Sequence, residues 1–98
     1  MATEIACIDV TPGSGEAFEA GAAEAVALFR AADGCTDMRL LRSHEREGRY
    51  WLIIEWRDVA AHEAFRATPA FARWRELVGP YFAGPPQVEH GIATAAGF

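Results

Sequence analysis

The chain has 98 residues, the length of one small domain, so we treat residues 1–98 as a single domain. Hydrophobic residues make up 51% and charged residues 23%, which is a folded rather than a disordered composition. No apolar run approaches the roughly 20 residues of a membrane helix. The first residues lack the basic and apolar segments of a secretory signal. We therefore expect a cytoplasmic protein without membrane contact.

Charge and side-chain chemistry exclude further classes. The net charge is -5, and all nine basic residues are arginines spread along the sequence. A nucleic-acid-binding domain would instead carry clustered basic residues, so we expect no nucleic-acid partner. The two cysteines, Cys7 and Cys35, form no CxxC pair, and the three histidines lack the spacing of metal ligands. We expect neither a metal nor another cofactor.

The first two expected elements are a strand and a helix. Apolar residues occupy both faces of a strand over 4–11, which Pro12 and Gly13 end. Ser14 is the expected N-cap of a helix over 15–32. The apolar stripe of this helix contains Phe18, Ala22, Ala25, Val26 and Phe29. Gly34 is expected to terminate it.

The next two strands, over 35–44 and 49–56, are close enough in sequence to form a hairpin. On the second of them Tyr50, Leu52, Ile54 and Trp56 share one face, and Trp51, Ile53 and Glu55 share the other. Apolar residues on both faces indicate a central strand with both faces covered.

The rest of the chain predicts helical segments followed by one strand. Asp58 is the expected cap of a helix over 59–67, and Thr68 and Pro69 restart the helix. Pro80 is expected to kink or end it. A last strand over 87–94 alternates Val88, His90 and Ile92 with polar residues, as the sequence shows.

The order strand, helix, strand, strand, helix, strand predicts an α+β, ferredoxin-like β-α-β-β-α-β fold with a four-stranded antiparallel sheet. Helices on one face would leave the other face bare. That face would expose the apolar residues Ile5, Cys7, Trp51 and Ile53. We therefore expect a homodimer in which two sheets pack face to face.

Four segments resemble the antibiotic biosynthesis monooxygenase family: VTPGSGEAFEA, GCTDMRLLRS, YWLIIEWRDVAAHEAFRATPAF and GPPQVEH. The resemblance runs from about residue 5 to residue 90, and the strand ending in Glu55-Trp56, followed by His62 and Thr68-Pro69, is its most specific part. It implies a dimeric α/β barrel of ferredoxin-like protomers. It also implies a relationship to cofactor-free oxygenases of phenols and anthrones, to quinol-oxidising proteins and to haem-degrading proteins.

The resemblance disfavours haem degradation. The positions that match the Asn, Trp and His of the haem-degrading relatives are Ala6, Phe65 and Arg75. Leu52 stands where the anthrone-oxidising relatives carry asparagine, so it has no donor for a substrate oxygen. This departure puts the anthrone reaction itself in question but leaves an apolar pocket possible.

Cofactor-free oxygenation needs a base, a hydrogen-bond donor and a group that stabilises negative charge. Trp56 is the candidate donor, or else a core tryptophan bonded to the backbone. His62 is the candidate base, at a position that resembles a tyrosine in the anthrone-oxidising relatives, or else a helix-edge histidine. Arg75 borders an apolar helix stripe and also matches an arginine of the polyketide-type relatives. It either stabilises a substrate anion or pairs with an acid.

The expected substrate pocket is lined by Leu52, Phe65, Trp74, Tyr81 and Met38, although aromatic and methionine side chains at such spacing also form ordinary cores. His44 and His90 are expected at the surface or at strand ends, without a functional role. The first hypothesis is a cofactor-free monooxygenase that oxidises an aromatic phenol, anthrone or quinol-type substrate with molecular oxygen. The alternatives are a non-catalytic dimeric module that binds a hydrophobic aromatic molecule, and a non-oxidative polyketide cyclase or isomerase.

Overall fold

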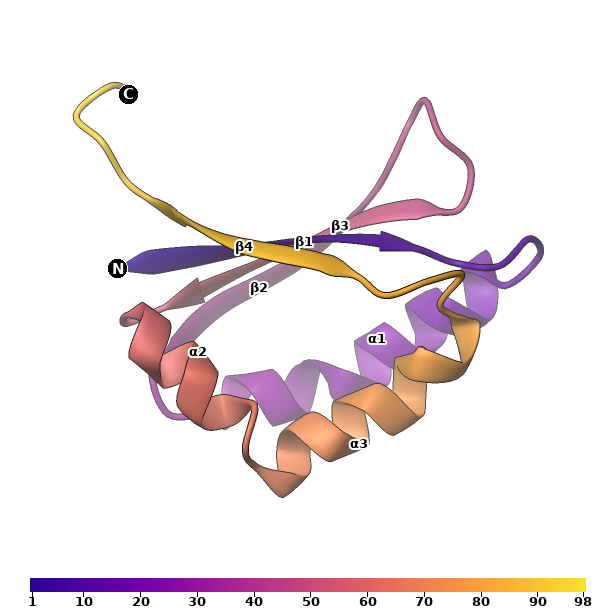
Figure 1. Ribbon diagram of the computed structural model, residues 1–98, viewed down its shortest axis with the longest axis horizontal. Coiled ribbons are helices and arrows are strands. Elements are labelled where there is room, and N and C mark those ends of the chain that lie inside the picture. The colour runs from indigo at the N-terminus through magenta and orange to yellow at the C-terminus, as the bar shows by residue number, and fades with distance from the viewer.

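A four-stranded antiparallel sheet carries all of the helices on one face in the computed structural model, which describes residues 1–98 (Figure 1). The strands lie in the order β2-β3-β1-β4. The elements are β1 (Ala2–Asp9), α1 (Gly15–Arg30), β2 (Cys35–Arg42), β3 (Arg49–Trp56), α2 (Val59–Phe65), α3 (Pro69–Val78), the short 3-10 helix η1 (Gly79–Tyr81) and β4 (Gln87–Ile92). No helix is long and apolar enough to cross a membrane.

This arrangement confirms the predicted ferredoxin-like fold, with the second helical region divided into α2, α3 and η1. The strand at 49–56 has the predicted bounds, whereas β1 begins two residues earlier than predicted and α1 ends two residues earlier. Apolar periodicity locates the middle of an element better than its ends, because the last turns are set by local hydrogen bonds.

The helix caps confirm two predictions and contradict one. The Asp58 carboxylate accepts a hydrogen bond from the Ala61 N–H at 2.8 Å, and the Thr68 hydroxyl accepts one from the Phe71 N–H at 3.3 Å. The Ser14 side chain does not cap α1. Its hydroxyl instead pairs with the Thr11 hydroxyl at 2.7 Å, within the turn that precedes the helix.

The core lies between the inner face of the sheet and the helices. On β3 the predicted inner face is buried: Tyr50, Leu52, Ile54 and Trp56 are each at most 3% exposed. The α1 stripe packs over it through Phe18, Ala22, Ala25 and Phe29. Helix α1 also lies very close to α3, since a Cβ placed on Gly21 would lie 2.5 Å from the Leu77 carbonyl oxygen.

The outer face of the sheet carries an apolar patch among charged residues and has no helix over it (Figure 1). Trp51 is 37% exposed and Leu41 is 48% exposed, and these two residues are cross-strand partners. Ile5, Cys7 and Ile53 on the same face are partly buried. Covering this face by a second copy of the chain remains a prediction.

Candidate active site

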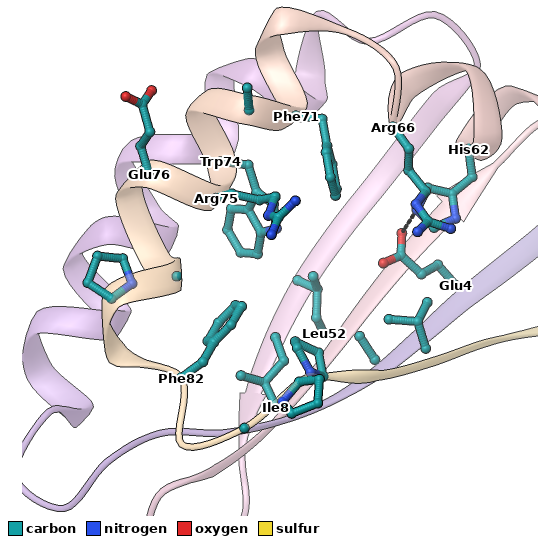
Figure 2. Close-up of a pocket in the computed structure, with 18 residues that line it drawn as sticks. Glu4, Ile8, Leu52, His62, Arg66, Phe71, Trp74, Arg75, Glu76 and Phe82 are labelled. Carbon is teal, nitrogen blue, oxygen red and sulfur yellow. Dashed lines mark ion pairs between the residues drawn. The ribbon is translucent and has the colours of Figure 1, made fainter.

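A cavity of about 940 Å³ lies between the inner face of the sheet and helices α2 and α3 (Figure 2). The sheet side of the wall comes from β1, β3 and the edge strand β4. The helix side comes from α2, α3 and the loop before β4. The lining residues include Glu4, Leu52, His62, Arg66, Phe71, Trp74, Arg75 and Phe82. The walls are thus mainly apolar and aromatic, with a few charged groups, which is the usual character of a small-molecule site.

One end of the cavity holds a buried carboxyl group. Glu4 shares its face of β1 with Ala6 and Ile8, so strand alternation turns its side chain into the protein, where it is 5% exposed. The Trp56 indole N–H donates to Oε1 of Glu4 at 2.9 Å. Nε2 of His62 lies 3.2 Å from the same oxygen. An otherwise costly buried acid therefore has two polar partners.

His62 is held between Trp56 and His90. Its helix, α2, begins at the Asp58 cap and places the imidazole beside β1, where the residue is 4% exposed. The ring stacks on the Trp56 indole, with centroids 5.0 Å apart and planes 17° apart. Nδ1 of His62 lies 2.7 Å from Nε2 of His90. His90 comes within reach because β4 pairs with β1 in a register that sets His90 opposite Glu4.

Burial favours the neutral forms of both groups at this end of the cavity. Desolvation raises the pKa of Glu4 above its ordinary value, and the Trp56 hydrogen bond and the Arg66 charge oppose this in part. Desolvation, together with the charges of His90 and Arg66, lowers the pKa of His62 to about 4. A neutral imidazole is the form that can accept a proton at neutral pH.

Two arginines lie on the helix side of the cavity and form no ion pair. Arg66 follows α2 directly, and Arg75 projects from α3 beside Trp74 (Figure 2). Arg73, two residues before Arg75, instead points away and lies 3.6 Å from the Glu24 carboxylate on α1. The ion pair considered for Arg75 is therefore absent, and its guanidinium is free to meet an anion in the cavity.

The structure brings two of the three predicted catalytic residues to the cavity. His62 and Arg75 line it, but Trp56 does not. Trp56 is fully buried, and its N–H is occupied by Glu4. The predicted position of Trp56 at the cavity wall is thus corrected, since the indole lies behind the carboxyl and contacts the cavity only through it.

Of the predicted pocket residues, Leu52 and Trp74 line the cavity. Phe65, Tyr81 and Met38 do not, for three different reasons. Phe65 is packed in the core between Phe29 and Trp56, with ring centroids 5.0 and 5.4 Å away. Tyr81 sits in η1, where its carbonyl oxygen accepts from the Thr11 N–H at 2.9 Å. Met38 lies on the edge strand β2, which β3 separates from β1, and it packs against the core.

Sequence reasoning missed Glu4 and His90. Strand alternation puts Glu4 on the same face as Ala6 and Ile8, and His90 on the same face as Val88. This alternation, and the pairing of the first and last strands in a ferredoxin-like sheet, can be predicted from the sequence. The cross-strand register that sets Glu4 opposite His90 cannot.

No cluster of three His, Cys, Asp or Glu side chains is arranged to hold a metal ion. Glu4, His62 and His90 contact one another directly as a chain. This chain can exchange protons with a molecule in the cavity, and the free arginines can stabilise the anion that remains.

Comparison with known proteins identifies the class. The family model described as antibiotic biosynthesis monooxygenase matches residues 1–77, and the chain belongs to this family. A crystal structure of a candidate antibiotic biosynthesis monooxygenase from Bordetella bronchiseptica is similar with a TM-score of 0.93 and 46% identity, covering 95% of this chain and 96% of that one. This confirms the resemblance seen in the sequence.

Two further proteins extend the comparison. The structure of PA3566 from Pseudomonas aeruginosa is similar with a TM-score of 0.80 and 29% identity, covering 96% of this chain and 94% of that one. YczJ of Bacillus subtilis, a protein described as uncharacterised, is 26% identical over 91 residues, which is 92% of this chain and 96% of YczJ. Each of the two matches covers more than nine-tenths of both chains.

Proposed function

We propose that the protein is a cofactor-free monooxygenase that oxidises an aromatic phenol, anthrone or quinol-type substrate with molecular oxygen. The observation that carries the proposal is the buried Glu4–His62 pair at the wall of a largely apolar cavity. Membership of the antibiotic biosynthesis monooxygenase family supports it. A cavity of about 940 Å³ is large enough for a molecule with several fused rings.

The reaction begins with removal of a proton from the substrate. A ring carbon or hydroxyl gives its proton to the Glu4–His62 pair, and the bonding electrons stay on the substrate as an electron-rich anion. Arg75 stabilises the anion across the cavity, while Phe71 and Trp74 hold the ring. A positioned base of this kind contributes about 10²–10⁴-fold to the rate.

Oxygen then reacts with the anion. The anion transfers one electron to molecular oxygen, and the two radicals combine to form a carbon–oxygen bond. The peroxide anion formed in this way takes up a proton from water, and for a ring CH₂ group loss of water from the resulting hydroperoxide leaves a carbonyl. In the net reaction one oxygen atom enters the product, and the other leaves as water with the equivalent of both hydrogens of the CH₂ group. The substrate supplies all of the electrons in this sequence.

Leu52 in the sheet wall restricts the substrate. A leucine side chain makes no hydrogen bond, so an oxygen on the substrate must find its partners at the Glu4 end or at Arg75. We therefore favour a phenol or hydroquinone whose hydroxyl reaches the Glu4 end while its apolar ring lies over Leu52. This preference follows because Glu4 and Arg75 are polar groups at separate places on the wall of the cavity, with the apolar Leu52 side chain also in that wall.

We also propose that the protein acts as a homodimer that buries the outer face of the sheet. The apolar side chains Ile5, Cys7, Trp51 and Ile53 would then lie between two sheets. Exposed apolar patches of this kind usually mark an interaction surface. The cavity lies on the opposite face of the sheet, between it and the helices, so dimerisation would leave it open.

Oxygen consumption tests the proposed activity. Chelator-treated protein is incubated with a panel of anthrones, naphthols and hydroquinones, and oxygen uptake and products are followed together. We expect one oxygen molecule consumed per substrate oxidised, above the rate without protein. Product formed equally well without oxygen would establish the cyclase or isomerase instead. Saturable binding of an unchanged ligand in air would establish the binding module.

A further inference from the structure

Both ring nitrogens of His62 already have partners inside the protein. Nε2 lies 3.2 Å from Oε1 of Glu4, and Nδ1 lies 2.7 Å from Nε2 of His90. A substrate in the cavity therefore meets no free nitrogen on His62. The imidazole can pass a proton between its neighbours, but it is badly placed to take one directly from the cavity.

Glu4, in contrast, has an oxygen left for the cavity. Its Oε1 has both the Trp56 N–H and His62 against it. The second oxygen, Oε2, forms no hydrogen bond within the protein. Figure 2 shows it directed away from His62, toward the open centre of the cavity. A carboxylate oxygen facing a substrate is a competent proton acceptor.

His90 connects this buried pair to the surface. Glu4 and His62 are both at least nine-tenths buried, whereas His90 is partly exposed on the edge strand β4. His90 does not line the cavity. The chain of contacts thus begins at the cavity and ends at the outside of the protein, in the order Glu4, His62, His90.

We propose that Glu4 takes the substrate's proton through Oε2, and that His62 and His90 form a proton relay between the other carboxyl oxygen and solvent. This inference rests on the proposed function and deepens it, because it names the group that acts on the substrate. It assigns His62 and His90 the work of restoring the Glu4 carboxylate along a path through the protein that is separate from the cavity.

The protons balance along the chain. When Glu4 is ionised, His62 carries its proton on Nε2, facing the carboxylate, and Nδ1 accepts from the Nε2–H of His90. Two rearrangements precede the transfer: the carboxyl group turns about its Cγ–Cδ bond, which brings the proton taken up at Oε2 to face His62, and His62 changes tautomer, so that its own proton lies on Nδ1. The carboxyl proton then moves to Nε2 of His62, the Nδ1 proton moves to Nε2 of His90, and the Nδ1 proton of His90 leaves to water. Each imidazole is neutral before and after.

Few other charged groups act on this chain. Arg66, which follows α2, acts on both Glu4 and His62 and favours the ionised carboxyl and the neutral imidazole. The Cys35 thiol on β2 is the other titratable group coupled to Glu4. Burial raises the pKa of this thiol, so it stays neutral at physiological pH and adds no charge. The proton exchange is therefore governed by Glu4, the two histidines and the fixed Arg66 charge.

Nitrogen NMR of the histidine rings tests the relay without any substrate. In ¹⁵N-labelled protein the shifts of Nδ1 and Nε2 report which nitrogen carries the proton. We expect the wild-type rings of His62 and His90 to change tautomer together as Glu4 titrates. In Glu4→Gln this joint change is lost. His44→Gln is the matched control, because the His44 side chain is 92% exposed and lies outside the chain of contacts. Independent behaviour of the two rings in wild-type protein would overturn the relay.

Kinetics on any substrate that is turned over provide the second test. Glu4→Gln should lower kcat by about 10²–10⁴-fold. His90→Gln should lower kcat with KM unchanged and should recover activity when imidazole is added as an external proton carrier. Full activity of His90→Gln, or of Glu4→Gln, would contradict the proposal. If no substrate is turned over, the proposed function fails, while the NMR experiment still decides whether the relay exists.

Discussion

Trp56 affects the cavity through Glu4, since its N–H donates to Oε1 of that carboxyl. Trp56→Phe removes this donor and keeps an aromatic ring against His62. We expect the pKa of Glu4 to rise further, because an ionised carboxylate loses a stabilising hydrogen bond. The acid limb of the rate profile should then move to higher pH, which initial rates across the pH range will measure. Trp51→Phe, on the outer face, is the control. An unmoved limb in Trp56→Phe would show that Glu4 does not limit the rate.

His62 makes stability depend on pH in a calculable direction. The folded histidine has a pKa of about 4, below its ordinary value of 6.5, so the unfolded chain takes up a proton first as pH falls. Its contribution is complete above pH 6.5 and disappears as pH falls through about 4. Glu4 has a raised pKa, so its protonation stabilises the folded state as pH falls and opposes the effect of His62. The effect of His62 is therefore measured in the Glu4→Gln variant, where this contribution is absent.

The prediction concerns the free energy of unfolding from urea denaturation. Between pH 6.5 and pH 4, Glu4→Gln should lose about 2–3 kcal/mol more than the double variant that also carries His62→Gln. Equal losses in the two proteins would mean that the folded state protonates His62 as readily as the unfolded state does.

Arg75 and Arg73 form a matched pair on α3, since one lines the cavity and the other faces Glu24. Removing a group that stabilises a developing anion costs about 2.7–4 kcal/mol in the transition state, or about 10²–10³-fold in rate. Arg75→Met should therefore lower kcat/KM by about that factor, and Arg73→Met should leave it unchanged. Equal activity in the two variants would remove Arg75 from the mechanism.

The residue types at this site were only partly predictable. His62 and Arg75 follow from their places beside apolar helix stripes, and both do line the cavity. Trp56 was expected either to offer its N–H to the substrate or to bond it to the backbone within the core. A strand pattern cannot show that a carboxyl on another strand already occupies that donor. From the sequence alone Glu4 is a polar residue near the beginning of a strand, and its role cannot be predicted without knowing which strands pair with β1.

At the scale of elements, the contact of α1 with α3 fixes the helix side of the cavity. Alanine normally suits a helix better than glycine by about 1 kcal/mol. At Gly21 the added Cβ would meet the Leu77 carbonyl oxygen at 2.5 Å, so α3 would have to move. We expect Gly21→Ala to lose about 1–3 kcal/mol of unfolding free energy in urea denaturation.

Gly79→Ala is the control for this substitution. Gly79 has helical backbone angles, φ -55° and ψ -38°, and a Cβ there meets nothing within 4 Å. It should be neutral or stabilising by up to about 1 kcal/mol, because alanine restricts the unfolded chain. If Gly21→Ala were as stable as Gly79→Ala, the helices would be less tightly apposed than the structure shows.

The elements themselves were largely predictable, because each carries a local signal. Asp58, Thr68 and Pro69 mark helix starts by their chemistry, and the 49–56 strand shows its two faces by alternation. Ser14 shows the limit of that reasoning. A serine before a helix can cap it or join the preceding turn, and the nearby Thr11 hydroxyl decided the outcome.

For the whole molecule, the uncovered outer face of the sheet predicts a dimer. We expect light scattering to give a mass of twice the 10.7 kDa of the chain at micromolar concentration. Ile53→Glu should shift the mass toward one chain, because a charge would be buried between the sheets. Leu41→Glu, nearer the edge of the same face, should have a smaller effect. A single-chain mass for the wild type would contradict the proposed assembly.

The ferredoxin-like topology followed from the order of the elements, but the cavity did not. Whether a helix lies tight on a sheet or leaves a chamber depends on where small and large side chains meet. Phe71 and Phe82, which the sequence does not distinguish from core residues, both line the cavity. The chain Glu4, His62, His90 likewise depends on three separate elements and on one strand register.

A structure of the protein with a bound naphthoquinone, the product expected from a naphthol or naphthohydroquinone substrate, is the most direct measurement. It should place the ring system between Leu52 and the α3 aromatics, with a product oxygen at hydrogen-bond distance from Oε2 of Glu4. Binding of that product elsewhere, for example in the alanine-lined groove between α1 and α2, with Glu4 turned away from the cavity, would contradict the account.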